Sequence, residues 1–189
     1  MVNEVDDWGD AMELKTAQSE MRAAHVGGAP GVLVSGIVWV IAGLIGLRVD
    51  VTHAFTVLFF GGIVIVPVAL FIARVMLRAP KPVGENPLDR LGLETTFFLF
   101  AGLLIAYALL PLNPVAVFPI MAVIIGARYF TFRTIYGEAV YWVLGAALIA
   151  VGGSALFGYT WPTNIAVVAG FVEVVFAVVL FVRREKAER

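Results

Sequence analysis

The sequence has no cysteine and only two histidines, His25 and His53. The missing thiols exclude disulfides, cysteine-ligated zinc, iron–sulfur clusters and thiol catalysis. Charged residues make up 14% of the chain, whereas a soluble domain usually carries about 25%. The formal net charge is −1, and this argues against a nucleic-acid partner because phosphates require a basic surface.

What the sequence has in abundance is apolar length. Hydrophobic residues make up 61% of its 189 residues, more than a water-soluble fold of this size can bury, so lipid must be its solvent. Six stretches are predicted to cross the membrane as helices, and the fourth, which is short, is expected to use Tyr129, Phe130 and Phe132 to complete its span. The stretches cover residues 31–47, 54–77, 93–110, 114–127, 138–158 and 163–182.

The segment before the first stretch has a different character. Residues 1–26 are rich in acidic side chains and have no apolar core, so they are not a signal peptide. Helical spacing of apolar residues over 7–26 predicts a helix, lying either on the bilayer surface or in solvent. We therefore divide the chain into an N-terminal cytoplasmic or interfacial helix at 1–30, a six-helix transmembrane domain at 31–182 and a basic cytoplasmic tail at 183–189.

Lys and Arg are distributed unevenly between the two sides that six spans create. One side receives Arg48 alone, and the other receives the remaining twelve of the thirteen. Because cytoplasmic loops retain positive charge, this pattern predicts an inner-membrane protein with both termini in the cytoplasm. The short connections at 111–114 and 159–162 predict tight turns. The expected fold class is therefore an all-α membrane protein with six transmembrane helices arranged as three antiparallel hairpins.

The three hairpins also share a local pattern. Each second helix ends in F-x-x-R, at 71–74, 130–133 and 181–184. Two explanations stay open: a true triplication, and the general tendency of a hairpin with a positive inner side to end in arginine. Small residues spaced four apart predict the helix–helix contacts, because they let backbones approach closely. These residues are Ala42/Gly46, Gly102/Ala106, Ala146/Ala150/Ser154 and Ala166/Gly170.

The stretch Gly27-Gly28-Ala29-Pro30-Gly31, followed by Ser35-Gly36 and Trp39, is similar to the start of an uncharacterised family of small bacterial six-helix inner-membrane proteins. The repeated hairpin pattern faintly resembles the HdeD-like acid-resistance membrane proteins. The long acidic N-terminal segment departs from both. The resemblance implies a bacterial inner-membrane protein, and it transfers no functional residue to this chain.

Glu173 is the most informative single residue, because it falls near the middle of the last apolar stretch. A charge near the bilayer centre is costly, so such a residue is a functional hypothesis by default. Ala166, Gly170, Glu173 and Ala177 share one helix face of small residues, which predicts that Glu173 points into the helix bundle and is uncharged at rest. Trp39, at similar depth, is a candidate hydrogen-bond donor to it. The alternative is a carboxyl that only holds helices together.

Other polar and kinking residues are predicted at the membrane rim or inside the helices. Acidic and basic side chains at the cytoplasmic helix ends are expected to form ion pairs that lock the helices, with a gate or headgroup site as the alternative. These residues are Glu94, Glu138, Arg74, Arg128 and Arg133. Pro67 and Pro119 are predicted to kink helices two and four, with freed carbonyls at an ion site as the alternative.

No catalytic motif stands out. The two histidines fall on opposite sides of the membrane, so no metal site is predicted, and there is no phosphate-binding loop or nucleophile elbow. We therefore expect no enzyme activity and no cofactor. Two functions stay open: a small proton-linked or cation-linked transporter that uses Glu173, with a homodimer and an unidentified ligand, and a non-transporting scaffold, stress-response or partner-binding subunit. In both, the bilayer is the principal partner.

Overall fold

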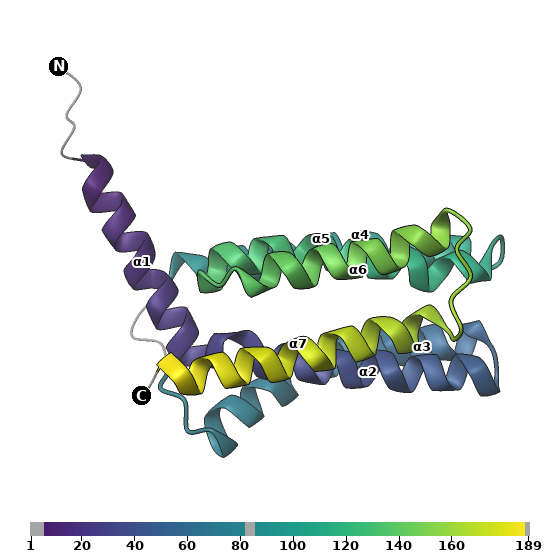
Figure 1. The fold of residues 1–189 in the computed structure, drawn as a ribbon, viewed down its shortest axis with the longest axis horizontal. Coiled ribbons are helices and arrows are strands. Elements are labelled where there is room, and N and C mark those ends of the chain that lie inside the picture. The colour runs from purple at the N-terminus through teal and green to yellow at the C-terminus, as the bar shows by residue number, and fades with distance from the viewer. Residues whose placement is uncertain (1–5, 82–85, 188–189) are drawn as a thin grey trace.

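The computed structural model describes residues 6–81 and 86–187, and these residues form an all-helical fold (Figure 1). Three short helical turns, η1 (Val26–Gly28), η2 (Ile72–Met76) and η3 (Pro114–Ala116), flank the main helices. The α-helices are α1 (Asp6–His25), α2 (Ala29–Arg48), α3 (Val51–Phe71), α4 (Pro87–Leu109), α5 (Val117–Tyr136), α6 (Val140–Leu156) and α7 (Ile165–Ala187).

The length and apolar composition of the helices agree with a membrane protein. Five helical segments, which contain α2, α3, α4, α5 and α7, are long and apolar enough to cross a membrane, whereas α6 is apolar but has only 17 residues. The predicted extension of the fourth stretch is confirmed, because α5 continues to Tyr136. It ends where Gly137 adopts a left-handed conformation, φ 69°, and its N–H caps the Arg133 carbonyl. The helix before the membrane is also confirmed as α1.

The main helices lie in two layers (Figure 1). One layer contains α2, α3 and α7, and the other contains α4, α5 and α6. Helix α7 packs most extensively on α2, and α6 packs most extensively on α5. Helices α6 and α7, predicted as the third hairpin, also contact each other, but less extensively, because they belong to different layers.

Glycine pairs explain why these two helix pairs are closest. A Cβ on Gly170 would lie 2.6 Å from the Gly36 carbonyl oxygen, and a Cβ on Gly36 would lie 2.8 Å from the Gly170 oxygen. Gly126 and Gly145 show the same reciprocal arrangement between α5 and α6, at 2.7 and 2.6 Å. Each pair lets two backbones touch, which is how membrane helices gain dispersion energy without a hydrophobic driving force.

The predicted small-residue contacts are confirmed on three helices and wrong on α6. Ala42, Ala106 and Ala166 are completely buried, and Gly102 and Gly170 lie against neighbouring helices. Ala146 and Ala150 are exposed. On α6 the buried small residues are Gly145 and Gly152, which lie one position before Ala146 and two positions after Ala150. The physical reason is that glycine permits a closer backbone approach than alanine, so the glycine face is the one that packs.

Two predictions need correction: where the third stretch begins, and whether Pro119 kinks its helix. The third stretch, predicted from residue 93, begins earlier, because Asn86 accepts a hydrogen bond from the Leu88 N–H and starts α4 at Pro87. Pro119 does not kink a helix: it lies in the first turn of α5, where a missing N–H removes no helical hydrogen bond. Pro67 does lie inside α3, on an exposed face, and the π-helical turn η2 follows that helix.

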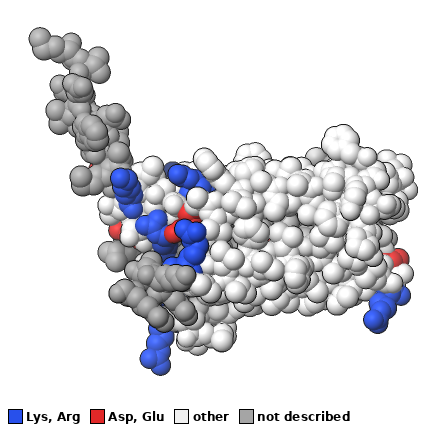
Figure 2. Space-filling model, viewed as in Figure 1, with Lys and Arg blue, Asp and Glu red and all other residues white. Residues whose placement is uncertain are grey.

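Charged side chains gather at the end of the bundle that carries α1 (Figure 2). We call this the basic end, and the opposite end, where Arg48 closes α2, the distal end. At the basic end, Val26, Gly27 and Gly28 all have positive φ, at 55°, 61° and 80°. This conformation is rare for a β-branched residue such as Val26. The three residues form the bend that turns α1 away from α2.

Candidate functional site

Glu173 lies at the boundary between the two layers and is completely buried. It is the ninth residue of α7, close to the middle of the apolar segment Ile165–Arg184. The small face predicted from the sequence packs inward, since Ala166 and Ala177 are also completely buried and Gly170 is buried. The prediction that Glu173 points into the bundle is confirmed.

The carboxyl takes contacts from both layers. The Tyr129 hydroxyl, on α5, donates to Glu173 Oε1 at 2.7 Å. The Ser35 hydroxyl, on α2, lies beside the carboxyl. Oε2 has no hydrogen-bond partner of good geometry among the described residues, although it is buried. A buried polar atom left without a partner is costly, so it marks a place where a further group could bind.

Arg128 is the cation that interacts electrostatically with Glu173. The sequence pattern placed Arg128 at the cytoplasmic rim and not beside Glu173, because the apolar part of the fourth stretch ends at residue 127. Arg128 does not bind the carboxyl directly: its Nε donates to the Thr95 hydroxyl at 3.1 Å, and its guanidinium lies 5.0 Å from the centre of the Phe132 ring. The carboxyl is therefore influenced by this charge without an ion pair.

Trp39 has a different role from the one predicted. It is buried on α2 one turn from Ser35, and its ring packs on Phe118 of α5, with centroids 6.1 Å apart. The donor to Glu173 is Tyr129, which the sequence analysis expected only to complete the span of the fourth stretch. Trp39 and Phe118 instead form an aromatic contact between the layers, on the distal side of Glu173.

A tyrosine cluster extends from Glu173 toward the basic end. Tyr129 stacks on Tyr141 at 5.9 Å, and Tyr141 stacks on Tyr136 at 5.5 Å. Phe132 packs edge-on against all three rings. The Tyr141 hydroxyl donates to the Gly27 carbonyl at 2.6 Å, in the bend between α1 and α2. A continuous aromatic and hydroxyl-bearing column thus joins the buried carboxyl to the basic end.

The rim residues predicted to pair with one another contact other groups. Arg74 donates to the Ala79 and Pro80 carbonyls, and the Arg133 guanidinium lies 5.3 Å from the centre of the Trp142 ring. Glu138 lies 4.0 Å from Arg183, which the prediction did not include, and Glu94 is exposed on α4. The structure thus does not bring the five predicted residues together.

Helix α1 is attached to the basic end of α5 by side chains. Gln18 donates to the Thr134 carbonyl and Arg22 to the Tyr136 carbonyl, each at 2.7 Å. Both carbonyls lie in the last turn of α5, where a cation also complements the helix dipole. Asn86 holds the same helix from the other side, donating to the Ala17 carbonyl at 3.0 Å. These contacts place α1 across the end of the tyrosine cluster.

We expect Arg22→Ala to loosen α1 from α5. The substitution leaves the Tyr136 carbonyl without its charged donor, which should lower the free energy of unfolding by about 1–2 kcal/mol. Hydrogen exchange of the α1 amides should become faster, as measured by mass spectrometry in detergent. Lys15→Ala is the matched control, because Lys15 is an exposed cation on the same helix. Equal effects of the two substitutions would show that the Arg22 contact does not hold α1.

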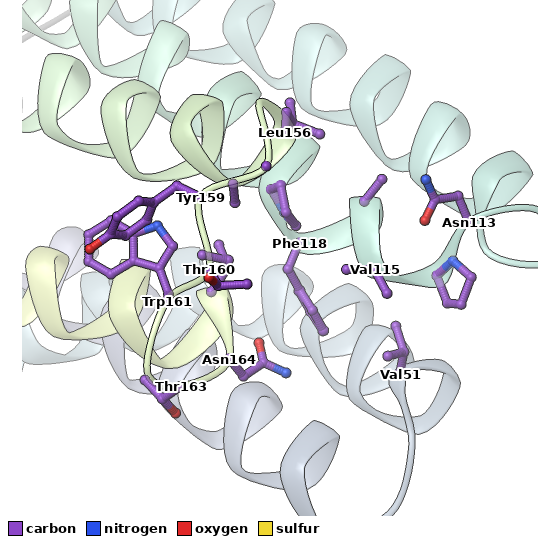
Figure 3. A pocket seen from close by; sticks show the side chains of 16 residues that line it. Val51, Asn113, Val115, Phe118, Leu156, Tyr159, Thr160, Trp161, Thr163 and Asn164 are labelled. Carbon is purple, nitrogen blue, oxygen red and sulfur yellow. The ribbon is translucent and has the colours of Figure 1, made fainter.

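A cavity of about 520 Å³ opens at the distal end (Figure 3). Its walls come from the start of α5, the end of α6 and the linker to α7, with Phe118 and Pro119 on the α5 side. Val51, at the start of α3, also contributes. Asp50, which precedes it, caps α3, and hydrogen bonds from His53 lower the pKa of this exposed carboxyl. Sequence patterns did not reveal this cavity, because its residues come from three separate segments of the chain.

Comparison with known proteins identifies the family. Residues 14–183 match the model of a family of unknown function (DUF7010), so the chain belongs to that family. The prediction of an uncharacterised family is confirmed, while the bacterial origin and the likeness to HdeD stay predictions. No curated protein and no solved structure matches the chain.

Proposed function

We propose that this member of the DUF7010 family crosses the membrane six times and moves protons or a small cation by way of Glu173. The observation that carries the proposal is a completely buried carboxyl near the middle of an apolar helix. Such a residue is expensive in lipid and is found where it serves a pathway or a binding site. Its Oε2 atom has no hydrogen-bond partner of good geometry among the described residues, and with the Ser35 hydroxyl beside the carboxyl it is the atom available to a cation or to a transferred proton.

The surroundings of Glu173 support a path through the protein. Ile165 lines the distal cavity and precedes Glu173 by eight residues on α7, which corresponds to about 12 Å along a helix. The Phe118–Trp39 contact lies between the cavity and the carboxyl. On the other side, Tyr129 and Tyr141 lead to the Gly27 carbonyl. Entry from the distal end would thus require the Phe118–Trp39 contact to open, and exit would require movement of the tyrosine cluster.

The second candidate is a non-transporting scaffold, stress-response or partner-binding subunit of the membrane. One observation favours it: the side chain of Glu173 is closed off from both ends, and Tyr129 already gives it a hydrogen bond. In this function the carboxyl only joins α7 to α5. The two candidates differ in one measurable respect, because only the first requires Glu173 to exchange its proton or bind a cation during activity.

A flux measurement tests the transport proposal. The purified protein is reconstituted into liposomes that contain a pH-sensitive dye, and a potassium gradient with valinomycin sets the membrane potential. We expect proton entry above that of liposomes carrying an unrelated membrane protein. Sodium and potassium gradients without a potential test the cation alternative. Flux no greater than the control under all gradients would reject transport and leave the scaffold function.

We also propose that the basic end faces the cytoplasm of a cell whose inner membrane holds the protein, as the distribution of Lys and Arg predicts. The cysteine-free chain makes the test direct. A membrane-impermeant maleimide added to intact cells should label Leu112→Cys, since Leu112 is 80% exposed at the distal end. Thr134→Cys, exposed at the basic end, should be labelled only after lysis. Labelling of Thr134→Cys in intact cells would reverse the orientation.

Six helices are few for a transporter, so we propose that two copies assemble. The mass of the protein in detergent, measured by light scattering with the detergent contribution subtracted, should correspond to a dimer. A monomer that retains flux in liposomes at high lipid excess would reject this part of the proposal without affecting the role of Glu173.

A further inference from the structure

We infer that the distal cavity binds an uncharged small molecule with a flat apolar body and one or two hydrogen-bonding groups. The inference goes beyond the proposed function, because this molecule is a ligand distinct from the proton or small cation that Glu173 would move. Binding in the cavity is a separate property, and it can be measured without any flux.

The charge of the lining decides the charge of the ligand. None of the sixteen residues that line the cavity is Asp, Glu, His, Lys or Arg. An ion that entered would lose part of its hydration without gaining a counter-charge, and this is costly. The nearest acidic group in sequence, Asp50, is engaged by His53 at 2.7 Å and lies outside the lining. The site therefore favours neutral molecules over cations and anions of the same shape.

The size and the walls of the cavity favour a ring. A volume of about 520 Å³ lies within the range of small-molecule sites, about 300–1,000 Å³. Tyr159 and Trp161 pack edge to face, with ring centres 5.4 Å apart, and Figure 3 shows them on one side of the cavity, with Phe118 nearer its middle. The Trp161 ring is fixed because its Nε1 donates to the Ser154 hydroxyl at 3.1 Å. Preorganised aromatic walls favour a flat apolar ligand.

Polar side chains in the wall of the cavity can orient a bound ligand through hydrogen bonds. Asn113 and Asn164 both line the cavity, and their carboxamides lie apart from the aromatic pair (Figure 3). Asn164 is held in place because its Oδ1 accepts from the Ala166 N–H at 2.8 Å. A small number of fixed polar groups in a mostly apolar cavity is the usual design of a specific small-molecule site. One or two hydrogen-bonding groups on the ligand would suffice to use them.

Three probes with the same ring test the ligand class. Indole is neutral, tryptamine is a cation at neutral pH and indole-3-acetate is an anion. Binding to the full-length protein in detergent is measured by equilibrium dialysis with radiolabelled probes. We expect indole to saturate one site per chain and the two ions to bind at least about tenfold more weakly. Octanol, which is neutral but linear, should compete poorly. Equal or tighter binding of either ion, or better competition by octanol, would overturn the inference.

Substitutions locate the site. Leu156→Trp adds bulk to a lining residue and should weaken indole binding by about tenfold or more, since it fills the cavity. Phe157→Trp is the matched control, because Phe157 is 95% exposed and is not a lining residue. Equal loss in the two variants, or no loss in Leu156→Trp, would show that indole binds elsewhere.

A negative charge added to the wall of the cavity should reverse its preference for the neutral probe over the cation. Asn113→Asp keeps the size of the side chain and should weaken indole binding while it strengthens tryptamine binding. Thr52→Asp adds the same charge at the distal end, on an exposed residue outside the lining, and should change neither. Unchanged preference in Asn113→Asp would contradict the assignment. Indole binding without proton flux would reject the proposed function alone, and flux without indole binding would reject this inference alone.

Discussion

Gly170→Ala should destabilise the protein, although the change adds only one methyl group. The new Cβ would lie 2.6 Å from the Gly36 carbonyl oxygen and close to the Val40 backbone nitrogen. Backbone atoms cannot rotate away as a side chain can, so α2 and α7 must separate. We expect a loss of about 1–3 kcal/mol of stability, as for overpacking of a tight core. Thermal unfolding in detergent, followed by circular dichroism, measures the loss.

The chain provides a close control for this experiment. Gly153 also lies inside an apolar helix, α6, and a Cβ there would meet no atom within 4 Å. Gly153→Ala should leave stability unchanged or raise it slightly, because alanine favours the helix. Gly145→Ala should behave like Gly170→Ala, since its Cβ would lie 2.6 Å from the Gly126 oxygen. If Gly170→Ala and Gly153→Ala unfold at the same temperature, the helices do not touch at this glycine.

Local patterns in the sequence predicted the helices well, and they predicted helix partners less well. The length of an apolar stretch is set by residues that are neighbours in sequence. The stretches predicted for α2, α3 and α7 therefore lie close to the helices that the structure contains. The pairing of α7 with α2 and of α6 with α5 depends on residues far apart in sequence, such as Gly36 and Gly170. Short connections suggested an α6–α7 hairpin, but a turn requires only that helix ends be near each other. The glycine faces, on which the backbones meet, decided the layers.

In the candidate site, too, local sequence patterns predicted one feature and missed the contacts made by residues far apart in sequence. The burial of Glu173 was predictable, because one helix face combined small residues with a single carboxyl. Its partner was not, because Tyr129 lies beyond the purely apolar part of the fourth stretch and was expected only to complete that span. The one available signal was the expected extension of that helix through residues 129–132, which turns Tyr129 toward α7. Arg128 was predicted at the rim, and its influence on Glu173 was missed for the same reason.

Glu173→Gln should abolish proton flux in liposomes while the protein remains folded. Glutamine keeps the shape of the side chain, and its amide oxygen can still accept the hydrogen bond that Tyr129 now donates at 2.7 Å. It cannot release or accept a proton at neutral pH. We therefore expect flux at the level of the control liposomes and a free energy of unfolding within about 1 kcal/mol of the parent. Flux and unfolding are measured on the same preparation.

Glu173→Leu and Tyr129→Phe separate the chemical role of the carboxyl from its structural one. Leucine leaves the buried Tyr129 hydroxyl without an acceptor, so it should cost stability, by about 1–2 kcal/mol at most. Tyr129→Phe removes the same hydrogen bond but keeps the carboxyl, so flux should persist, with an altered dependence on pH, because the environment of the titrating group has changed. If Glu173→Gln retained full flux, Glu173 would only join α7 to α5. If Tyr129→Phe lost all flux while Glu173→Gln kept it, the proton path would run through the tyrosine instead.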